Sequence, residues 1–396
     1  MFKIVHIITR FVNGGADENT LLTCNAQAAA GHEVVLIYGA DHTARMVDGL
    51  DPRVTKLVMP SLVRTVAPVR DIVALVQTII QLRRLRPDVI HTHTSKAGII
   101  GRLAALAAPE AVVVHGVHIL PFSAQRPVLR FVYLALEKLT GLVTDAYIDV
   151  SEGMKTECLA HGLGTDDRHR VIASGMDVAK FRDALPANDV ASIGAGAFTA
   201  PIRIGYVAVL ERRKRHRELF EAVTPLLRRH PHVHLVLAGE GPERAALEAL
   251  AEDKGVANRI HLLGFRGDVE AVLAACDICV FASEREGLPR SLVQYGLAGK
   301  PIVASHLPGI ERVLRHEDNG YVVGADAFDE FAARLETLVG SAVLRDAMAA
   351  RSRALDLSDW DARRMTDRID AVYAQLLSGR SRGSGRIEAS GWSDLT

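Results

Sequence analysis

The stretch Ser283-Glu-Arg-Glu-Gly-Leu-Pro-Arg-Ser-Leu-Val-Gln-Tyr-Gly-Leu-Ala-Gly299 decides how the whole chain is interpreted. It follows an apolar run typical of a buried strand, Ile278 to Ala282, and precedes a second such run, Pro301 to Ala304. Between them, Gly-Leu-Pro is typical of a turn, and Arg290 to Ala298 of a short helix. Glu286 is therefore expected just past the carboxyl end of a strand, beside a helix N-terminus with free backbone amides. This arrangement suits a ligand that carries both hydroxyls and phosphates.

Length and composition predict a soluble protein with two domains. The chain has 396 residues, of which 48% are hydrophobic and 24% charged, and its formal net charge is zero. That length gives room for two cores, and the neutral charge gives no global attraction to nucleic acid, so no nucleic-acid partner is expected. No signal peptide is expected, because the chain opens directly into a strand pattern, and no membrane-spanning segment is expected, because charged residues interrupt the longest apolar regions. We expect a cytoplasmic protein, and association with the cytoplasmic face of the membrane stays open.

The four cysteines do not form a disulfide framework. Cys276 and Cys279 make a C-x-x-C, which is found in zinc and redox sites. They lie in a strand pattern, where positions three apart point to opposite faces, and there is no second pair. We therefore expect buried structural thiols in a reducing compartment.

Alternating apolar runs and amphipathic stretches predict parallel sheets with helices on both faces. This alternation of strand and helix patterns is interrupted by an Ala/Gly/Ser/Pro-rich stretch and then resumes. It indicates an α/β protein of two doubly wound, Rossmann-like domains with a cleft between them. The expected parts are an N-terminal domain at 1–182, a linker at 183–201, a C-terminal domain at 202–357, a final helix at 358–377 and a disordered tail at 378–396.

Two loops of the first half carry candidate binding residues. Asn13-Gly-Gly-Ala16 follows the first strand, and Gly14 and Gly15 let backbone pass close to a bound group ahead of a helix start. In His91-Thr-His-Thr-Ser-Lys96, the two histidines share a face of the strand. A zinc site would need a third ligand and a supporting carboxylate, for which there is no local evidence, so no metal is expected.

The stretch 283–299 resembles the acidic signature of the family 4 glycosyltransferases, which are retaining enzymes of the GT-B fold. In that signature two glutamates, eight positions apart, hold a nucleotide sugar. Glu286 matches the first, and Gln294 stands at the second position. The resemblance extends from Lys3 to about Leu377, and it implies that the final helix braces the first domain.

The resemblance also assigns residues of the first domain. The string from His91 to Arg102 is similar to a bacterial subgroup that builds surface polysaccharides, in which Ser95 and Lys96 open a helix facing the acceptor. A solvated Lys96 in the first helical turn is the alternative. His118 matches a histidine that meets the donor sugar, although Ile119 replaces the usual Gly, and His115 is a nearby rival.

In the second domain the resemblance implies a cationic site for the leaving diphosphate. Lys214 stands four residues after Leu210, as in the family, but Val209 occupies the usual Arg position. Arg212, Arg213 or Arg215 are possible substitutes, and a solvated helix start explains some of these cations equally well. Placed cations would stabilise the departing diphosphate electrostatically.

The remaining donor-binding residues come from loops that match the family in order. They are Gly239 and Gly241 after one strand, Arg266 near the nucleotide base, and Leu288, Arg290, Ser291 and Gln294 around the signature helix. Backbone amides near Arg290 and Ser291 would hold the diphosphate together with Lys214.

The sequence thus predicts a retaining glycosyltransferase of the hexosyltransferase class, with His118, Lys214 and Glu286 as catalytic residues. It would move a sugar from a nucleoside diphosphate donor, expected to be a UDP-sugar, to a hydroxyl of a growing, lipid-linked glycan in polysaccharide biosynthesis. No cofactor or metal is expected, because the family uses leaving-group phosphate as the proton acceptor and no Asp-x-Asp string is present. A nucleotide-sugar epimerase, a phosphorylase and a non-catalytic nucleotide-sugar-binding module stay open, whereas a dehydrogenase is disfavoured because no G-x-G-x-x-G follows the first strand.

Two groups of basic residues suggest a contact with the inner membrane. They are Arg83, Arg84 and Arg86, and Arg126, Arg130 and Lys138. Such faces attract anionic lipid, but ordinary solvated helix faces are an equally good explanation.

Overall fold

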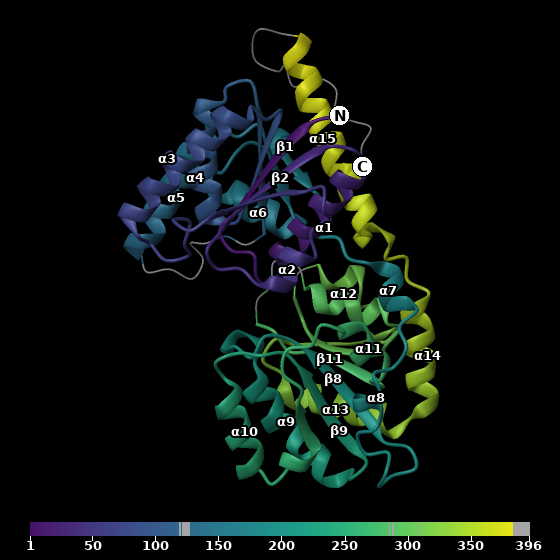
Figure 1. The fold of residues 1–396 in the computed structure, drawn as a ribbon. Helices are drawn as coiled ribbons and strands as arrows, with labels where there is room; N and C mark the ends of the chain where they lie inside the picture. The colour runs from purple at the N-terminus through teal and green to yellow at the C-terminus, as the bar shows by residue number, and fades with distance from the viewer. Residues whose placement is uncertain (119, 121–126, 285, 287–288, 308, 383–396) are drawn as a thin grey trace. The chain divides into compact units, whose positions relative to one another are not determined.

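The structure, a computed structural model, describes residues 1–118, 120, 127–284, 286, 289–307 and 309–382. The chain divides into two compact units (Figure 1). Unit 1 comprises Met1–Met176 and the segment from Asp359 onward, and unit 2 comprises Asp177–Ser358.

Unit 1 contains a seven-stranded parallel sheet in the order β3-β2-β1-β4-β5-β6-β7. The inner strands are almost wholly buried, as expected for parallel strands covered on both faces, whereas the edge strand β3 is mostly exposed. They are β1 (Lys3–Ile8), β2 (Glu33–Gly39), β3 (Thr55–Met59), β4 (Val89–His93), β5 (Val112–Val117), β6 (Ala146–Asp149) and β7 (His169–Val171).

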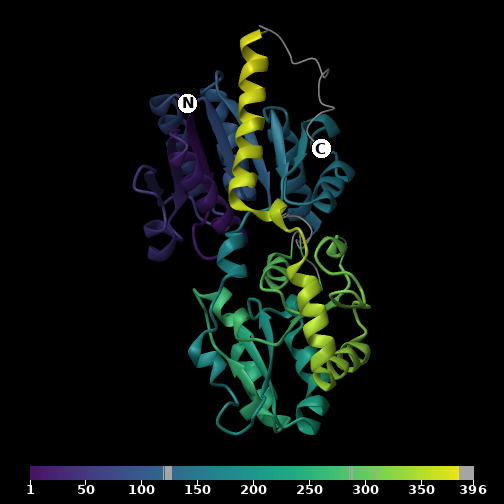
Figure 2. The ribbon, with the colours of Figure 1, turned by 90° about the vertical axis from the view of Figure 1, so that its right-hand side faces the viewer.

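The helices of unit 1 cover both faces of this sheet. On one face α3 and α5 flank α4, and on the other α1 packs against α15, which runs along the sheet (Figures 1 and 2). Apolar side chains of α15, including Met365, Ile369 and Val372, share a core with strands β1, β4 and β5. The helices are α1 (Gly15–Ala29), α2 (Ala44–Asp48), α3 (Pro68–Leu85), α4 (Ser95–Ala104), α5 (Pro127–Gly141), α6 (Glu152–Ala160) and α15 (Ala362–Arg382).

Unit 2 contains a six-stranded parallel sheet in the order β10-β9-β8-β11-β12-β13. Strand order in this sheet reverses between β8 and β11, as it does between β1 and β4 in unit 1. In such sheets ligands bind at the carboxyl ends of the two strands that flank this switch point. The strands are β8 (Ile202–Val207), β9 (Val233–Ala238), β10 (Ile260–Leu262), β11 (Ile278–Phe281), β12 (Ile302–Ser305) and β13 (Gly320–Val323).

In unit 2, helices α9, α10 and α13 contribute to the larger core, and α8 and α11 cover the opposite face of the sheet. Short 3₁₀ turns precede several elements, and one of them, Arg212–Lys214, lies at the switch point. The helices are α7 (Val178–Arg182), α8 (Asn188–Ala191), α9 (His216–Arg229), α10 (Arg244–Asp253), α11 (Val269–Ala274), α12 (Arg290–Leu297), α13 (Phe328–Gly340) and α14 (Ala342–Arg353).

The predicted linker at 183–201 is wrong. This segment forms α8, whose Val190 is fully buried against β9 and α11, and the amide of Ala187 donates to the carbonyl of Ala271 at 2.9 Å. The unit boundary lies at residue 176 and not 182, because Lys180 of α7 pairs with Glu270 of α11 at 2.9 Å. Small alanines pack closely without an apolar stripe, so the sequence pattern did not reveal this packing.

The predicted disordered tail begins too early. Helix α15 continues to Arg382, and the guanidinium of Arg380 contacts the Asp145 carboxylate at 2.9 and 3.1 Å and the carbonyls of Pro109 and Ala111. These bonds hold a stretch whose composition alone is typical of disorder. Residues 383–396 of the predicted tail lie outside the described residues. The predicted cleft concerns how the two units sit relative to each other, and it stays a prediction.

Candidate active site

The switch point of unit 2 brings Lys214 and Glu286 together. Lys214 ends the 3₁₀ turn after β8, and Glu286 follows the neighbouring strand β11. The amide of Glu284 donates to the carbonyl of Arg213 at 2.9 Å, which ties the two loops to each other. Residues 72 positions apart in sequence thus form one charged site.

Glu286 is paired with two cations in this site. Its carboxylate contacts the ammonium of Lys214 through Oε1 and the guanidinium of Arg213 through Oε2, the latter at 3.4 Å. The side chains of Lys214 and Glu286 are 10% and 13% exposed, so the pair is shielded but reachable. The structure therefore brings Lys214, Arg213 and Glu286 together in one ion cluster, and their role in donor binding stays a prediction.

Two buried tyrosines hold the segment from the end of β8 to Lys214. The hydroxyl of Tyr206, on β8, donates to the carbonyl of Lys214 at 2.7 Å. The hydroxyl of Tyr295, on α12, accepts the amide of Val207 at 2.8 Å. Arg215 then turns the chain into α9 with a φ of 54°, which is unusual for a residue with a side chain. Neither tyrosine was predicted, although their position within apolar runs was visible in the sequence.

Other cations predicted near Lys214 have different environments. Arg212 is exposed, and Arg215 pairs with Asp326 at 2.7 Å. Val209, at the position where the family places an Arg, is 46% exposed. Of the three arginines considered as substitutes, Arg213 is therefore the one that pairs with Glu286.

Gly239 and Gly241 have a packing role in this structure. A Cβ on Gly239 would lie 1.9 Å from the carbonyl oxygen of Ala208, and one on Gly241 would lie 2.4 Å from that of Leu210. Their backbone thus lies directly on the loop that leads to Lys214. The predicted contact of these glycines with a donor stays a prediction.

Arg266 is already paired with two carboxylates. Its guanidinium contacts Asp268 at 2.7 and 2.8 Å and Asp189 at 2.5 and 3.3 Å. Hydrogen bonds to these two acids raise the pKa of Arg266. A nucleotide base near this loop would meet a side chain that is held in place by its own unit.

The signature helix α12 is where expected. It begins at Arg290 after Pro289, and Arg290, Ser291 and Gln294 are half-buried. Leu288 lies outside the described residues.

The switch point of unit 1 is built from neutral polar side chains. The hydroxyls of Thr9, after β1, and Thr94, after β4, lie 3.1 Å apart, and the amide of Ala97 donates to Thr9 at 2.9 Å. Thr94 has a φ of 62°, a strained conformation of the kind found at functional sites. Sequence reasoning missed both threonines, although Thr9 is the last residue of the first predicted strand and Thr94 directly follows the predicted strand that ends at His93.

The amides of the glycine loop after β1 are partly used by the protein itself. The carboxylate of Asp17 accepts the amides of Gly14 and Val12 at 2.9 and 3.2 Å. Gly15 opens α1 and is exposed. A phosphate at this loop would have to displace an acid that is 4% exposed, so the structure gives Gly14 a capping role that the sequence had not indicated.

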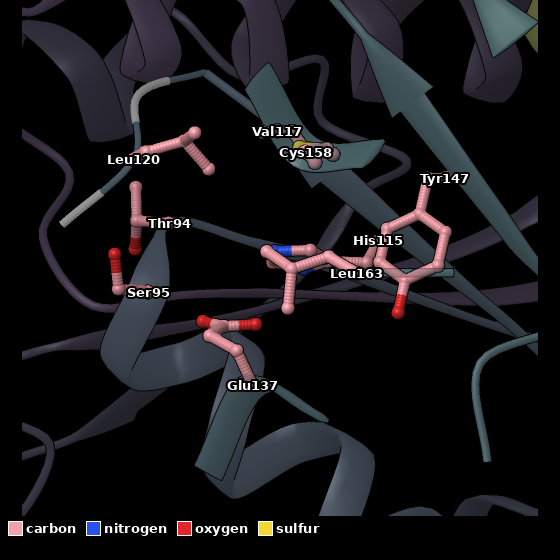
Figure 3. A pocket seen from close by; sticks show the side chains of 10 residues that line it. Thr94, Ser95, His115, Val117, Leu120, Glu137, Tyr147, Cys158 and Leu163 are labelled. Carbon is pink, nitrogen blue, oxygen red and sulfur yellow. The ribbon is translucent and has the colours of Figure 1, made fainter. Parts of the chain in front are cut away.

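Ser95 and Lys96 start α4 but differ in environment. Ser95 lines a narrow pocket together with Thr94, His115, Glu137, Tyr147 and Leu163 (Figure 3). The pocket has room for about one water molecule. Lys96 pairs with Asp71 of α3 at 2.5 Å and donates to the carbonyl of Thr65, so it is neither a solvated residue nor directed at the pocket.

The histidines of unit 1 lie on two faces of the sheet. His118 is half-buried, with Nε2 3.3 Å from Nδ1 of His93. The rival His115 is buried, with Nδ1 2.9 Å from the hydroxyl of Thr92, and burial lowers its pKa well below the usual value. Of the two, His118 has the position at the end of β5 that the resemblance implies.

Two family models match the chain. The model described as "Glycosyl transferase 4-like domain" matches residues 14–175, and that described as "Glycosyl transferases group 1" matches residues 201–341. The chain belongs to the GT-B glycosyltransferases.

Several glycosyltransferases of known sequence are similar to it. "UDP-Gal:alpha-D-GlcNAc-diphosphoundecaprenol alpha-1,3-galactosyltransferase" of Escherichia coli is 26% identical over 84% of this chain and 87% of that protein. The "Lipopolysaccharide core biosynthesis glycosyltransferase LpsE" of Rhizobium meliloti is 32% identical over 46% of this chain and 51% of that protein.

Solved structures support the fold. Anabaena HepE in complex with UDP and glucose superposes with a TM-score of 0.79 at 20% identity, covering 94% of this chain and all of that one. WaaG, a glycosyltransferase involved in lipopolysaccharide biosynthesis, gives a TM-score of 0.75 at 17% identity, covering 93% of this chain and 99% of that one. These structures confirm the predicted two-domain GT-B fold, and the two family models confirm the predicted family. No helix of this glycosyltransferase, among the described residues, is long and apolar enough to cross a bilayer.

Proposed function

We propose that this glycosyltransferase is a retaining hexosyltransferase that moves a sugar from a UDP-sugar to a hydroxyl of a lipid-linked glycan. The observation that carries the proposal is the Lys214–Glu286–Arg213 cluster at the switch point of unit 2. The name of the E. coli relative specifies a UDP-sugar donor and a diphosphoundecaprenol-linked acceptor, which supports both substrate classes.

Unit 2 would bind the donor. Phosphate oxygens of the donor would take the ammonium of Lys214 and the guanidinium of Arg213, and this releases the Glu286 carboxylate to accept hydrogen bonds from sugar hydroxyls. Negative charge grows on the diphosphate as the glycosidic bond breaks, so cations that are already in place lower the barrier. Gln294 would contact the ribose, because its amide both donates and accepts.

Unit 1 would bind the acceptor, and His118 would hydrogen-bond a sugar hydroxyl. Front-face substitution explains retention: the acceptor oxygen attacks the anomeric carbon on the side from which UDP leaves, and a phosphate oxygen takes the hydroxyl proton. No protein side chain is then needed as general base, and no metal is assigned a step.

A surface of α3 and α5 supports contact with a membrane. Both helices expose large apolar side chains, and basic residues lie on each of them. The basic residues are Arg83 and Arg84 on α3, Arg86 directly after it, and Arg130 and Lys138 on α5. Arg126 lies outside the described residues. Apolar side chains beside cations suit the interface of an anionic bilayer, where the acceptor lipid would be found. The exposed apolar residues are Val69, Ile72, Val73, Val76 and Ile80 on α3 and Phe131, Val132 and Leu139 on α5.

Incubation with a panel of UDP-sugars tests the function. Slow release of UDP, accelerated by a membrane lipid extract with transfer of label to lipid, is expected. Interconversion of the sugar would instead indicate an epimerase, and binding without turnover a non-catalytic module. An α-linked product from an α-linked donor, measured by NMR, supports retention, and inversion would contradict it.

Co-sedimentation with anionic vesicles tests the membrane surface. The double variant Ile72→Glu/Ile80→Glu should lose most vesicle binding while UDP-sugar hydrolysis is kept. Val343→Glu is a matched control, because Val343 is also exposed but lies in unit 2. Equal binding by both variants would contradict the assignment of this surface.

A further inference from the structure

A chain of hydrogen bonds runs through the core of unit 1 from α15 to the end of β5. Asp370 Oδ1 lies 2.7 Å from Gln27 Nε2, and Gln27 Oε1 lies 2.8 Å from His6 Nε2. His6 Nδ1 lies 2.9 Å from His93 Nε2, and His93 Nδ1 lies 3.3 Å from His118 Nε2. Each step joins a different element, namely α15, α1, β1, β4 and the residue after β5.

The middle of this chain is sealed from water. His6 and Gln27 are fully buried and His93 is 1% exposed. Gly116 allows the imidazoles to approach, since a Cβ there would lie 3.1 Å from His93 Nδ1 and 3.2 Å from His118 Nε2. Burial lowers the pKa of His6 to about 4 and that of His93 well below its usual value, so both rings are neutral near pH 7. A neutral imidazole has one donor and one acceptor nitrogen.

The carboxylate of Asp370 fixes the direction of every bond. Oδ2 of Asp370 also lies 3.7 Å from Nε2 of His32. Because Nδ1 of His32 accepts the amide of Phe2, Nε2 of His32 carries the proton and faces the Asp370 carboxylate. A carboxylate only accepts, so Gln27 must turn its NH₂ to Asp370 and its oxygen to His6. The Nε2 of His6 is then the donor and its Nδ1 the acceptor.

The same logic continues to His118. Because His6 Nδ1 accepts, His93 must donate from Nε2, which leaves His93 Nδ1 as an acceptor. The proton of the last bond must therefore belong to His118 Nε2. In neutral His118 the lone pair is then on Nδ1.

Metal binding is the competing use of these histidines. Nitrogens of His6, His91 and His93 lie within 4.8 Å of one another. However, the facing nitrogens of His6 and His93 lie 2.9 Å apart and share a proton, so an ion could bind them only by breaking this hydrogen bond.

We propose that Asp370, acting through Gln27, His6 and His93, holds His118 in its Nε2–H tautomer, so that Nδ1 accepts a hydrogen bond from a hydroxyl of the bound sugar. The role in sugar binding rests on the proposed function, whereas the tautomer follows from the hydrogen bonds alone. Asp370, Gln27, His6 and His93 are positioning residues, because they act through His118.

Two variants at one position test the direction of the chain. In Gln27→Lys the ammonium pairs with Asp370 and donates to His6 Nε2, which reverses every bond and places the proton of His118 on Nδ1. In Gln27→Glu/Asp370→Asn an acceptor still faces His6, and the wild-type direction is kept. Both variants bury one charge at residue 27, so they differ mainly in hydrogen-bond polarity.

Imidazole ¹⁵N shifts of the full-length protein report the tautomers. The resonances are assigned by loss of signal in His118→Asn and His93→Asn. We expect protonated Nε2 on both rings in the wild type and in the double variant, and protonated Nδ1 in Gln27→Lys. Protonated Nδ1 on His118 in the wild type would overturn the proposal, even if no variant folds. Stoichiometric zinc in the purified protein, with histidine shifts that change when a chelator removes it, would also overturn it.

Activity adds a second readout. Gln27→Lys should lower kcat/KM for transfer about 10- to 100-fold, the scale for groups that orient a functional histidine from behind, and Gln27→Glu/Asp370→Asn should recover most of that loss. Equal losses in the two variants, at equal thermal stability, would overturn the role in sugar binding. A wild-type protein that transfers no sugar would refute the proposed function while the ¹⁵N shifts still decide the tautomer.

Discussion

The two units share a strand order but fill their switch points differently. In unit 2 the carboxyl ends of β8 and β11 present an ion cluster, with Lys214 and Arg213 on Glu286. In unit 1 the neighbouring strands β1 and β4 present neutral threonines and imidazoles that bond to one another in the core. Buried charges need partners or solvent, whereas neutral donors and acceptors can be fully enclosed once they are paired. This difference fits the proposed function, in which unit 2 binds a diphosphate and unit 1 binds hydroxyl groups.

Removal of the Glu286 carboxylate should reduce activity more than any other change at the charged site of unit 2. Glu286→Ala is expected to reduce transfer at least about 100-fold, because sugar hydroxyls lose their acceptor and two cations lose their partner. Thermal unfolding should change little, since the side chain is reachable by water. Glu248→Ala, which removes an exposed carboxylate of α10, is the control. Near-normal turnover by Glu286→Ala would refute its assigned role.

Lys214→Ala separates binding from transition-state stabilisation. Losing a cation that meets the growing negative charge should raise the barrier by about 3 kcal/mol, seen as a lower kcat. Lys254→Ala, in a surface pair of the same unit, should behave as wild type. If KM alone rises, Lys214 binds the ground state and does not act in the transition state.

Acid should act on the imidazole network of unit 1. The native pKa of His6 is about 4, below its value of about 6.5 in the unfolded chain, so between these values only the unfolded state takes up the proton. Stability is therefore unaffected above pH 6.5, falls as the pH is lowered, and has lost about 3 kcal/mol from this one group near pH 4. His91 and His93 shift in the same direction because they are buried. In unit 2, burial also lowers the pKa of His216 and that of His234 to about 4, so hydrogen exchange measured from pH 7 to 4 should show both units losing protection, and full protection of unit 1 at pH 4 would contradict this.

The glycine loops of the two units should respond unequally to a methyl group. Gly239→Ala should lower the free energy of unfolding by about 1–3 kcal/mol or more, because its Cβ would overlap the carbonyl of Ala208. Gly14→Ala should cost less, since the nearest atom to its Cβ is a carboxylate oxygen of Asp17 at 3.1 Å. Urea denaturation measures both, and equal losses would show that these contacts do not decide stability.

The smallest change is expected at Gln294. Gln294→Glu restores the acid of the family signature on a half-buried position of α12, and UDP-sugar affinity should stay within about threefold of wild type or improve. Gln77→Glu, on the surface of unit 1, is the control for added charge. A large loss of affinity, measured by calorimetry, would show that Gln294 has a different role.

The order of motifs along the chain was enough to predict the family, the fold and the placement of a Glu after one strand and a Lys after another in the same region of the second domain. Parallel strands bring their carboxyl ends to one edge, so a Lys at 214 and a Glu at 286 meet once their strands are neighbours. Arg266, Lys96 and Gly14 were harder to place. Each has a partner elsewhere in its own unit, and those partners, Asp189, Asp71 and Asp17, carried no motif of their own.

By itself the sequence determined the two parallel sheets, because uninterrupted apolar strands between amphipathic helices are stable only when covered on both faces. It also determined which residues end those strands. Only the tertiary structure decided what those residues contact: that Glu286 is held by two cations, and that Asp370 of the last helix is connected to His118 through Gln27, His6 and His93. The physical reason is that hydrogen bonds and ion pairs act over about 3 Å, and contacts at that range between distant segments exist only after the strands and helices have packed.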